Sequence, residues 1–430
     1  MYITWRAVAL TGLGTIPAMV SASSVLAWVW WAMVVVLCLV DVVAAPSPRT
    51  IALRRDTSPS VRLTESTSAT VTVLNMGTRA ITGMLRDAWQ PSAGATHNRH
   101  RLDIPPQERR TFTTPLLPTR RGDRHAGPVT VRLRGPLGLA GRQLSVACPA
   151  TLRVLPEFAS RRHLPSRLAR LRELDGRSAV QIRGPGSEFD SLREYVIGDD
   201  VRSIDWRATA RRSEMVVRTW RPERDRQVMI VVDTSRTSAA RIGDSPRLDA
   251  SIDATLLLSA LASKAGDRIQ AIGFDRSVRA RVSGITGAGL MPALADRFAP
   301  IEPRLVEADW PGVVSTVRES LSQRALVVLL TSIDPAAVDG GLLRAIAPLA
   351  QKHQVVIASV DDPEITAMTA DRDGPLGVYG AAAATRFELE RQAIAVRLRQ
   401  RGVEVVSAGP DDLAPALADT YLALKAAGRL

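Results

Sequence analysis

The sequence is poor in cysteine. Its 430 residues contain two, Cys38 in an apolar run and Cys148 in a polar region, so we expect no disulfide framework. Lysine is also rare, and nearly all of the positive charge is carried by arginine. The chain has no phosphate-binding P-loop, no paired-histidine metal motif and no nucleophile elbow, so its motifs do not indicate an ATPase or a hydrolase.

Positive charge is in excess and unevenly distributed. The formal net charge is +13; residues 49–226 carry 33 basic and 18 acidic side chains, whereas residues 227–430 carry 22 and 24. A basic region beside a membrane anchor is attracted to anionic lipid head groups, and nucleic acid is the other usual partner of such charge. Because the arginines are interleaved with acids, a solvated surface is the simplest interpretation. We therefore expect no nucleic-acid partner.

The N-terminal region is a long apolar stretch. Residues 7–44 are interrupted only by "SASS" at 21–24, and Asp41 is their one charged side chain. Each half is about long enough to cross a bilayer as a helix, which predicts a transmembrane helical hairpin in residues 1–46. Arg6 precedes it and Arg49 follows it, so the soluble domains are expected on the cytoplasmic side of the cell membrane. The alternative is a cleaved signal peptide ending near Ser23, with the second run as the anchor.

Residues 47–156 consist of short alternating runs separated by glycine and proline. "SATVTVLN", for example, alternates with a period of two. Several short strands with such turns predict a β-sandwich-like domain. Residues 157–226 are expected to be a linker, in which leucines that repeat after Pro165 among arginines indicate a short basic amphipathic helix.

Residues 227–430 show an α/β pattern. Apolar runs such as "QVMIVVD" and "RALVVLLTS" alternate with helical segments, which predicts a mainly parallel sheet covered on both faces. Ligands of such sheets bind beyond the C-terminal ends of the strands. Asp233, Ser235 and Thr237 follow the first strand, and their oxygen atoms are of the kind that Mg²⁺ prefers.

The end of the linker, "LREYVIGDDVRSIDWRATARR", is dense in opposite charges. Arginine binds carboxylates in a bidentate way and stacks on aromatic faces, so an irregular segment held by internal ion pairs is one interpretation. On that interpretation Arg202 and Asp205 each stabilise a charged partner. The alternative is a docking surface for a protein partner. The residues concerned are Arg193, Glu194, Tyr195, Asp199, Asp200, Arg202, Asp205, Trp206, Arg207 and Arg211.

These segments, together with "VMIVVDTS" and "HQVVIASVDDPE", resemble the domain-of-unknown-function 58 (DUF 58) family from about residue 49 to the end. The resemblance implies a membrane hairpin, a β-domain and a von Willebrand factor A-like domain, which is a Rossmann-like, doubly wound and mainly parallel α/β sheet. It also implies a MoxR-type AAA+ ATPase as partner in assembling other proteins.

The resemblance further implies a degenerate metal-ion-dependent adhesion site, for which the pattern is D-x-S-x-S. Asp233 and Ser235 match, and Thr237 replaces the second serine while keeping the hydroxyl. Asp309 could substitute for the usual threonine ligand, and Asp334 stands two residues beyond the usual position of a distal aspartate. Mg²⁺ or Mn²⁺ is the cofactor implied. The alternative is a strand-end aspartate that accepts hydrogen bonds from backbone amides of its own loop.

Two classes of function remain after the sequence is read. The first is a membrane-anchored interaction or assembly factor that has no enzymatic activity of its own. In this case the ATPase activity belongs to its partner. The second is an enzyme, such as a metal-assisted hydrolase; binding of nucleic acid or anionic lipid by the basic N-terminal half is a further alternative. The sequence does not specify the oligomeric state.

Overall fold

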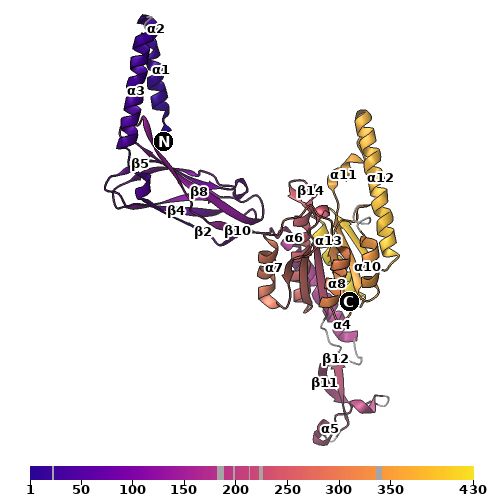
Figure 1. The fold of residues 1–430 in the computed structure, drawn as a ribbon. Coiled ribbons are helices and arrows are strands. Elements are labelled where there is room, and N and C mark those ends of the chain that lie inside the picture. Colours follow the sequence, from indigo (N-terminus) through magenta and orange to yellow (C-terminus); the bar gives the residue numbers. More distant parts are fainter. Residues whose placement is uncertain (22–23, 182–187, 197–198, 213, 222–225, 336–340) are drawn as a thin grey trace. The chain divides into compact units, whose positions relative to one another are not determined.

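The computed structural model describes the whole chain except residues 22–23, 182–187, 197–198, 213, 222–225 and 336–340 (Figure 1). The chain forms two compact units, Met1–Glu157 and Phe158–Leu430. The mixed α/β architecture with several sheets confirms the coarse expectation from the sequence.

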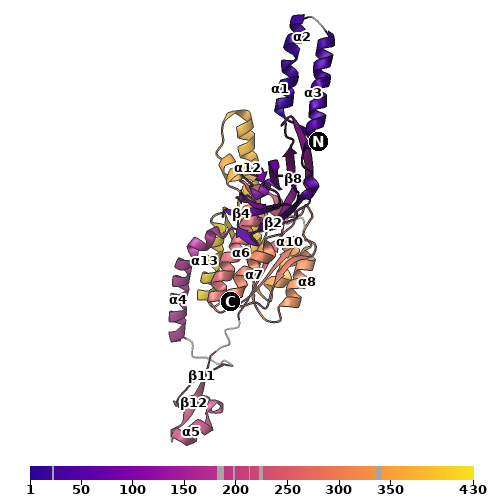
Figure 2. The same ribbon diagram turned by 90° about the vertical axis from the view of Figure 1, so that its left-hand side faces the viewer.

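The first unit begins with a pair of antiparallel helical segments (Figure 2). Helices α1 (Trp5–Leu13) and α2 (Thr15–Ser21) lie along α3 (Ser24–Ala44). The first apolar segment is thus divided in two at Gly14, where a Cβ atom would lie 1.8 Å from Trp30 Cδ1. Among the described residues, one helical stretch, Ser24–Thr50, is long and apolar enough to cross a membrane. This stretch belongs to the second half of the predicted hairpin.

Asp41 ties this helical hairpin to the β-domain. Its carboxylate accepts hydrogen bonds from the backbone N–H groups of Leu137, Leu139 and Ala140, each at 2.8 Å. Asp41 is fully buried, and a buried carboxylate is tolerated only when such partners compensate it. A Cβ atom at Gly135 would lie 2.2 Å from Asp41 Oδ1, so this turn needs glycine there.

The β-domain is built from two sheets whose inner faces share a core. Val71 and Val73 of one sheet cluster with Ile81, Leu85 and other buried residues of the second sheet. The small sheet has the order β2 (Ile51–Thr57), β4 (Thr67–Asn75), β7 (Arg109–Leu116). The larger sheet has the order β1 (Tyr2–Ile3), β9 (Ala140–Val146), β8 (Gly122–Arg134), β10 (Thr151–Leu155), β3 (Ser60–Arg62), and β5 (Ile81–Trp89) joins β8 to β6 (Arg99–Ile104).

A buried ion pair connects the two sheets. Arg55 of β2 pairs with Asp87 of β5, and both side chains are fully buried. Arg55 also donates to the carbonyls of Gly127 and Cys148. The indole Nε1 of Trp89 donates to the second Asp87 oxygen at 3.0 Å. Each charge therefore has several partners in a region that water does not reach.

The segment between the two domains is more regular than the sequence suggests. Helix α4 (Leu164–Gln181) is longer than the short helix expected. The charged segment forms an antiparallel pair, β11 (Glu188–Glu194) and β12 (Val216–Arg221), with α5 (Trp206–Arg212) in the connection. We call this element the charged hairpin. The two ends of the charged segment are therefore more regular than expected, whereas residues 199–205 between them contain one short 3-10 helix, Val201–Ser203.

A six-stranded sheet forms the core of the second unit. Its strands β13, β16, β18, β19 and β20 are parallel, and β17, which the sequence did not predict, is antiparallel to β16. The order is β17 (Val278–Val282), β16 (Arg268–Phe274), β13 (Gln227–Asp233), β18 (Leu326–Leu330), β19 (Gln354–Val360), β20 (Glu404–Ala408).

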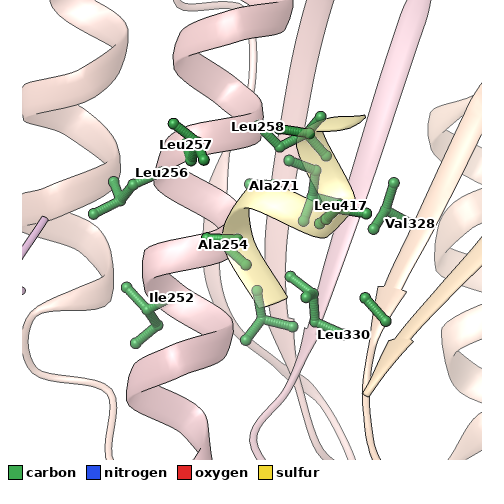
Figure 3. Close-up of a cluster of buried hydrophobic side chains, with 14 of the residues drawn as sticks. Ile252, Ala254, Leu256, Leu257, Leu258, Ala271, Val328, Leu330 and Leu417 are labelled. Carbon is green, nitrogen blue, oxygen red and sulfur yellow. The ribbon is translucent and has the colours of Figure 1, made fainter. Parts of the chain in front are cut away.

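Helices cover both faces of this sheet. One core cluster joins Val228, Ile230 and Val232 of β13 to helices of one face, and the other joins Met229 and Val231 to helices of the opposite face. Figure 3 shows the first cluster, where leucines of α6 and α13 meet β16 and β18. The first face holds α6 (Arg247–Lys264), α7 (Leu290–Phe298) and α13 (Leu413–Ala426), and the second holds α8 (Trp310–Ser320), α10 (Leu342–Ala350) and α12 (Gly374–Arg399).

We predict that Asp87→Asn destabilises the β-domain by about 3–5 kcal/mol, because it leaves the buried Arg55 charge without its carboxylate. The matched control is Asp56→Asn, whose partner Arg54 is 79% exposed; exposed pairs contribute at most about 1 kcal/mol. Thermal unfolding of the detergent-solubilised chain measures both. Equal melting temperatures for the two variants would contradict the prediction.

Candidate functional site

The strand-end aspartate of the central strand is enclosed by hydrogen-bond donors. Asp233 is the last residue of β13 and is 3% exposed. Its Oδ1 accepts from the backbone N–H of Ser235 at 2.8 Å, and its Oδ2 accepts from the hydroxyls of Thr237 and Thr331, each at 2.7 Å. Both carboxylate oxygens are therefore compensated by the strand-end loop and by Thr331, which follows β18. Thr331 was not among the residues predicted from the sequence.

Three of the five residues predicted to bind a metal, Asp233, Ser235 and Thr237, are hydrogen-bonded to one another, whereas Asp309 and Asp334 have other partners. Ser235 Oγ and Thr237 Oγ1 lie 3.3 Å apart beside Asp233. Asp309 instead caps α8, where its Oδ1 accepts from Gly312 N at 3.1 Å. Asp334 forms ion pairs with Arg247 and Arg391.

Two arginines occupy the C-terminal edge of the sheet with Asp334. Arg247, at the start of α6, pairs with Asp334 at 3.2 Å, and Arg391 of α12 approaches the other Asp334 oxygen at 3.7 Å. Arg391 also pairs with Asp361, which follows β19, and with Glu388 at 3.2 Å. We call these five residues the arginine–carboxylate network. Its members come from four separate segments, and Asp361 could have been noticed because it follows an apolar strand as Asp233 does.

The network keeps Arg391 charged although it is buried. Burial alone would lower the pKa of Arg391, but its hydrogen bond with Asp361 and the charges of Asp361, Glu388 and Asp334 outweigh it, so the pKa is raised. A buried guanidinium requires such carboxylates.

These residues as arranged do not fit a divalent cation. The oxygens of Asp233 already accept from three donors, and Asp334 is paired with arginines. Among the described residues no group of three or more His, Cys, Asp or Glu side chains is arranged to hold a metal. A divalent ion would also be repelled by the two guanidinium groups.

The charged hairpin holds a second group of predicted residues. Arg193 binds Asp199 in a bidentate way, with Nη1–Oδ2 and Nη2–Oδ1 distances of 2.7 and 2.6 Å. The backbone N–H of Val196 donates to Asp199 Oδ2 at 2.9 Å. The hydrogen bond from Arg193 is the main reason why the pKa of Asp199 is lowered. This pair closes the turn that follows β11.

Asp205 organises the other half of the charged hairpin. Its Oδ1 caps α5 by accepting from the N–H groups of Arg207 and Ala208, each at 3.0 Å, and its Oδ2 accepts from Arg218 Nε at 2.8 Å. The Ala208 N–H and then Arg218 lower the pKa of Asp205. The partner of Asp205 is therefore Arg218 of β12 and not Arg202.

Other predicted residues of the charged hairpin have backbone or surface roles. Asp200 accepts from the N–H of Arg202 at 2.9 Å, and the N–H of Tyr195 donates to Met215 O at 2.8 Å. The Glu194 carbonyl accepts from Arg193. Arg202, Arg207 and Arg211 are exposed.

The Trp206 side chain is also 65% exposed. Among the described residues, the cation–π contacts involve Trp89, Tyr2 and Tyr421 and do not include Trp206. Three more large apolar side chains of the charged hairpin are exposed: Val196, Val201 and Met215. The ion pairs thus fix the backbone of this element while its apolar side chains face solvent.

The sequence of this region decides the family. Residues 191–404, from the charged hairpin to β20, match the family described as "Protein of unknown function DUF58". The chain belongs to the DUF58 family. The match begins within β11, so it includes most of the charged hairpin. The matched stretch is shorter than the one from about residue 49 over which we expected the resemblance.

The DUF58 relatives include uncharacterized proteins of Mycobacterium tuberculosis and Mycobacterium bovis, which are 28% identical over 185 residues. That alignment covers 42% of this chain and 57% of each relative. The uncharacterized protein YeaD of Bacillus subtilis is 26% identical over 168 residues, which cover 39% of this chain and 40% of YeaD. The chain thus spans little more than half the length of the mycobacterial relatives.

Two solved structures each resemble about a quarter of this DUF58 protein. The CARDB domain of a Pyrococcus furiosus protein is 13% identical with a TM-score of 0.19, and covers 24% of this chain and 87% of that chain. A FixG-related protein of Vibrio parahaemolyticus is 8% identical with a TM-score of 0.17, and covers 24% of this chain and 96% of that chain.

We predict that Asp334→Asn lowers the stability of the DUF58 protein by about 2 kcal/mol or more, because it removes a carboxylate from two buried guanidinium groups.

We also expect that millimolar Mg²⁺ or Mn²⁺ leaves the melting temperature of the wild type unchanged, since an ion that bound only the folded state would raise it.

Thermal unfolding checks both expectations. The control is Glu390→Gln, whose partner Arg386 is 82% exposed, and which should unfold like the wild type. A rise in melting temperature with Mg²⁺ that disappears in Asp233→Asn would overturn the second expectation and restore the metal site.

Proposed function

We propose that this DUF58 protein is a membrane-anchored interaction factor that docks a MoxR-type AAA+ ATPase and takes part in assembling other proteins. Four large apolar side chains are exposed on the charged hairpin, and this observation supports a protein partner most directly. Exposed apolar groups on a rigid frame are typical of docking surfaces. Trp206 is the strongest candidate for an anchor, since tryptophan is enriched at the energetic centres of interfaces.

The C-terminal domain in this proposal is von Willebrand factor A-like. The strand order, in which the first strand lies between the second and the fourth, supports that assignment. In such a sheet, partners are expected at the C-terminal strand ends, where the arginine–carboxylate network lies. We propose that this domain contacts its partner through side chains rather than through a shared metal ion.

Membrane anchoring in the proposal rests on α3, which is long and apolar enough to span. Arg6 and Arg49 flank the helical hairpin, and positive flanks remain on the cytoplasmic side. An ATP-dependent partner would be met on that side. The proposal needs no catalytic group in this chain, because ATP hydrolysis belongs to the partner.

We predict that Trp206→Ala weakens binding of a MoxR-type ATPase from the same organism by about tenfold or more, as expected for a buried aromatic anchor. The full-length protein in detergent would be immobilised and ATPase binding measured with ATP present. The matched control is Leu117→Ala, which removes a 51% exposed side chain of the β-domain. Asp205→Asn should also weaken binding, because it loosens α5. Unchanged binding by the Trp206 variant would refute docking through the charged hairpin.

The predicted topology is checked separately. Alkaline phosphatase, which is active only outside the cytoplasm, should be inactive when fused after Leu430, and green fluorescent protein at the same position should fluoresce. An active phosphatase fusion would place the C-terminal domain on the other side of the membrane and favour the signal-peptide alternative.

A further inference from the structure

An apolar cavity lies at the base of the helical hairpin. It has a volume of about 440 Å³, within the range of ligand pockets, and its wall is formed by α1, α3, β1 and the start of β9. The residues that line it include Tyr2, Ala7, Val8, Val34, Cys38 and Ala140. The lining is almost entirely apolar, so the space suits a hydrocarbon chain.

The helical hairpin is tightly packed farther from the β-domain. The indole Nε1 of Trp30 donates to Leu10 O at 3.0 Å, and the same indole packs directly against Gly14. Near the β-domain the two segments are held apart, because β1 pairs with β9 and the Thr4 hydroxyl donates to Gly138 O at 2.7 Å. The cavity therefore follows from how α1 is attached and is not a gap left by loose packing.

Arginines surround this base. The Arg132 guanidinium lies 5.5 Å from the centre of the Tyr2 ring, which lines the cavity. A Cβ atom at Gly138 would lie 3.2 Å from Arg6 Nη1 and 3.4 Å from Arg134 Cδ. Arg6, Arg132 and Arg134 thus come together beside one turn at the edge of the cavity.

Within the part of the chain that the structure describes, none of these three arginines forms an ion pair with a carboxylate. Arg132 bonds the neutral amide oxygen of Gln143 at 2.7 Å. The nearby Asp41 carboxylate is buried and already accepts from three backbone amides. The positive charge is therefore available to an anionic ligand.

We propose that this base binds one anionic phospholipid, with an acyl chain in the cavity and the phosphate among Arg6, Arg132 and Arg134. Arginine binds phosphate oxygens in a bidentate way, and basic pockets at the ends of membrane helices bind anionic head groups. The cavity joins an apolar helical hairpin to a basic β-domain, so the two parts of a phospholipid meet matching surfaces. Trp5, 76% exposed at the start of α1, is typical of a residue at the membrane interface.

Native mass spectrometry of the detergent-solubilised full chain tests the site. Dioleoyl phosphatidylglycerol should be retained at one molecule per chain, and dioleoyl phosphatidylcholine, which has the same acyl chains, at least about tenfold more weakly. The double variant Arg132→Gln/Arg134→Gln should lose about tenfold in phosphatidylglycerol affinity, whereas Arg110→Gln on β7 should not.

A second pair of variants tests the acyl-chain cavity. Val8→Trp fills the cavity from an exposed position and should abolish retention of phosphatidylglycerol, whereas Val43→Trp changes a 74% exposed position outside the cavity and should retain it. Equal retention of the two lipids would overturn the proposal, as would unchanged binding by the double arginine variant. Equal retention by the two tryptophan variants would also overturn it, because the lipid would then be bound only around the helices.

Discussion

The central strand β13 is buried on both faces, and the second unit is organised around that constraint. Alternate residues of β13 enter two separate core clusters, so each face must be covered by helices. The strand then ends in a carboxylate, Asp233, at the same buried level. Because an uncompensated buried charge is very costly, the loop after β13 and Thr331 must supply donors to it. The hydrogen bonds around Asp233 thus follow from the burial of one strand.

The same requirement explains many of the arginines. Arg55, Arg247 and Arg391 are buried and each is paired with carboxylates. Their charges are compensated inside the protein. The arginines at the base of the helical hairpin differ. Arg6, Arg132 and Arg134 form no ion pair with a carboxylate within the described residues. Because these positive charges are not neutralised within the fold, we expect an anionic ligand to bind there.

The two proposed surfaces serve different partners. The charged hairpin presents apolar side chains on a frame fixed by Arg193–Asp199 and Asp205–Arg218. The base of the helical hairpin presents arginines beside an apolar cavity. One surface suits a protein, where buried aromatic anchors supply most of the binding energy, and the other suits a lipid. Each can be removed by substitutions that leave the other intact.

The sequence by itself determined the order of segments: an apolar N-terminus, short alternating strands, then apolar strands alternating with helices. These depend on periodicity, which is local. It did not reveal β17, whose "VRARV" contains two arginines, nor the strand pairing of the charged hairpin. It suggested a metal site at Asp233, Asp309 and Asp334, but the distances between these residues in space cannot be read from their separation in the chain. Only the tertiary structure brought Arg247 and Arg391 to Asp334, since side chains on different segments meet only when helices pack on the sheet.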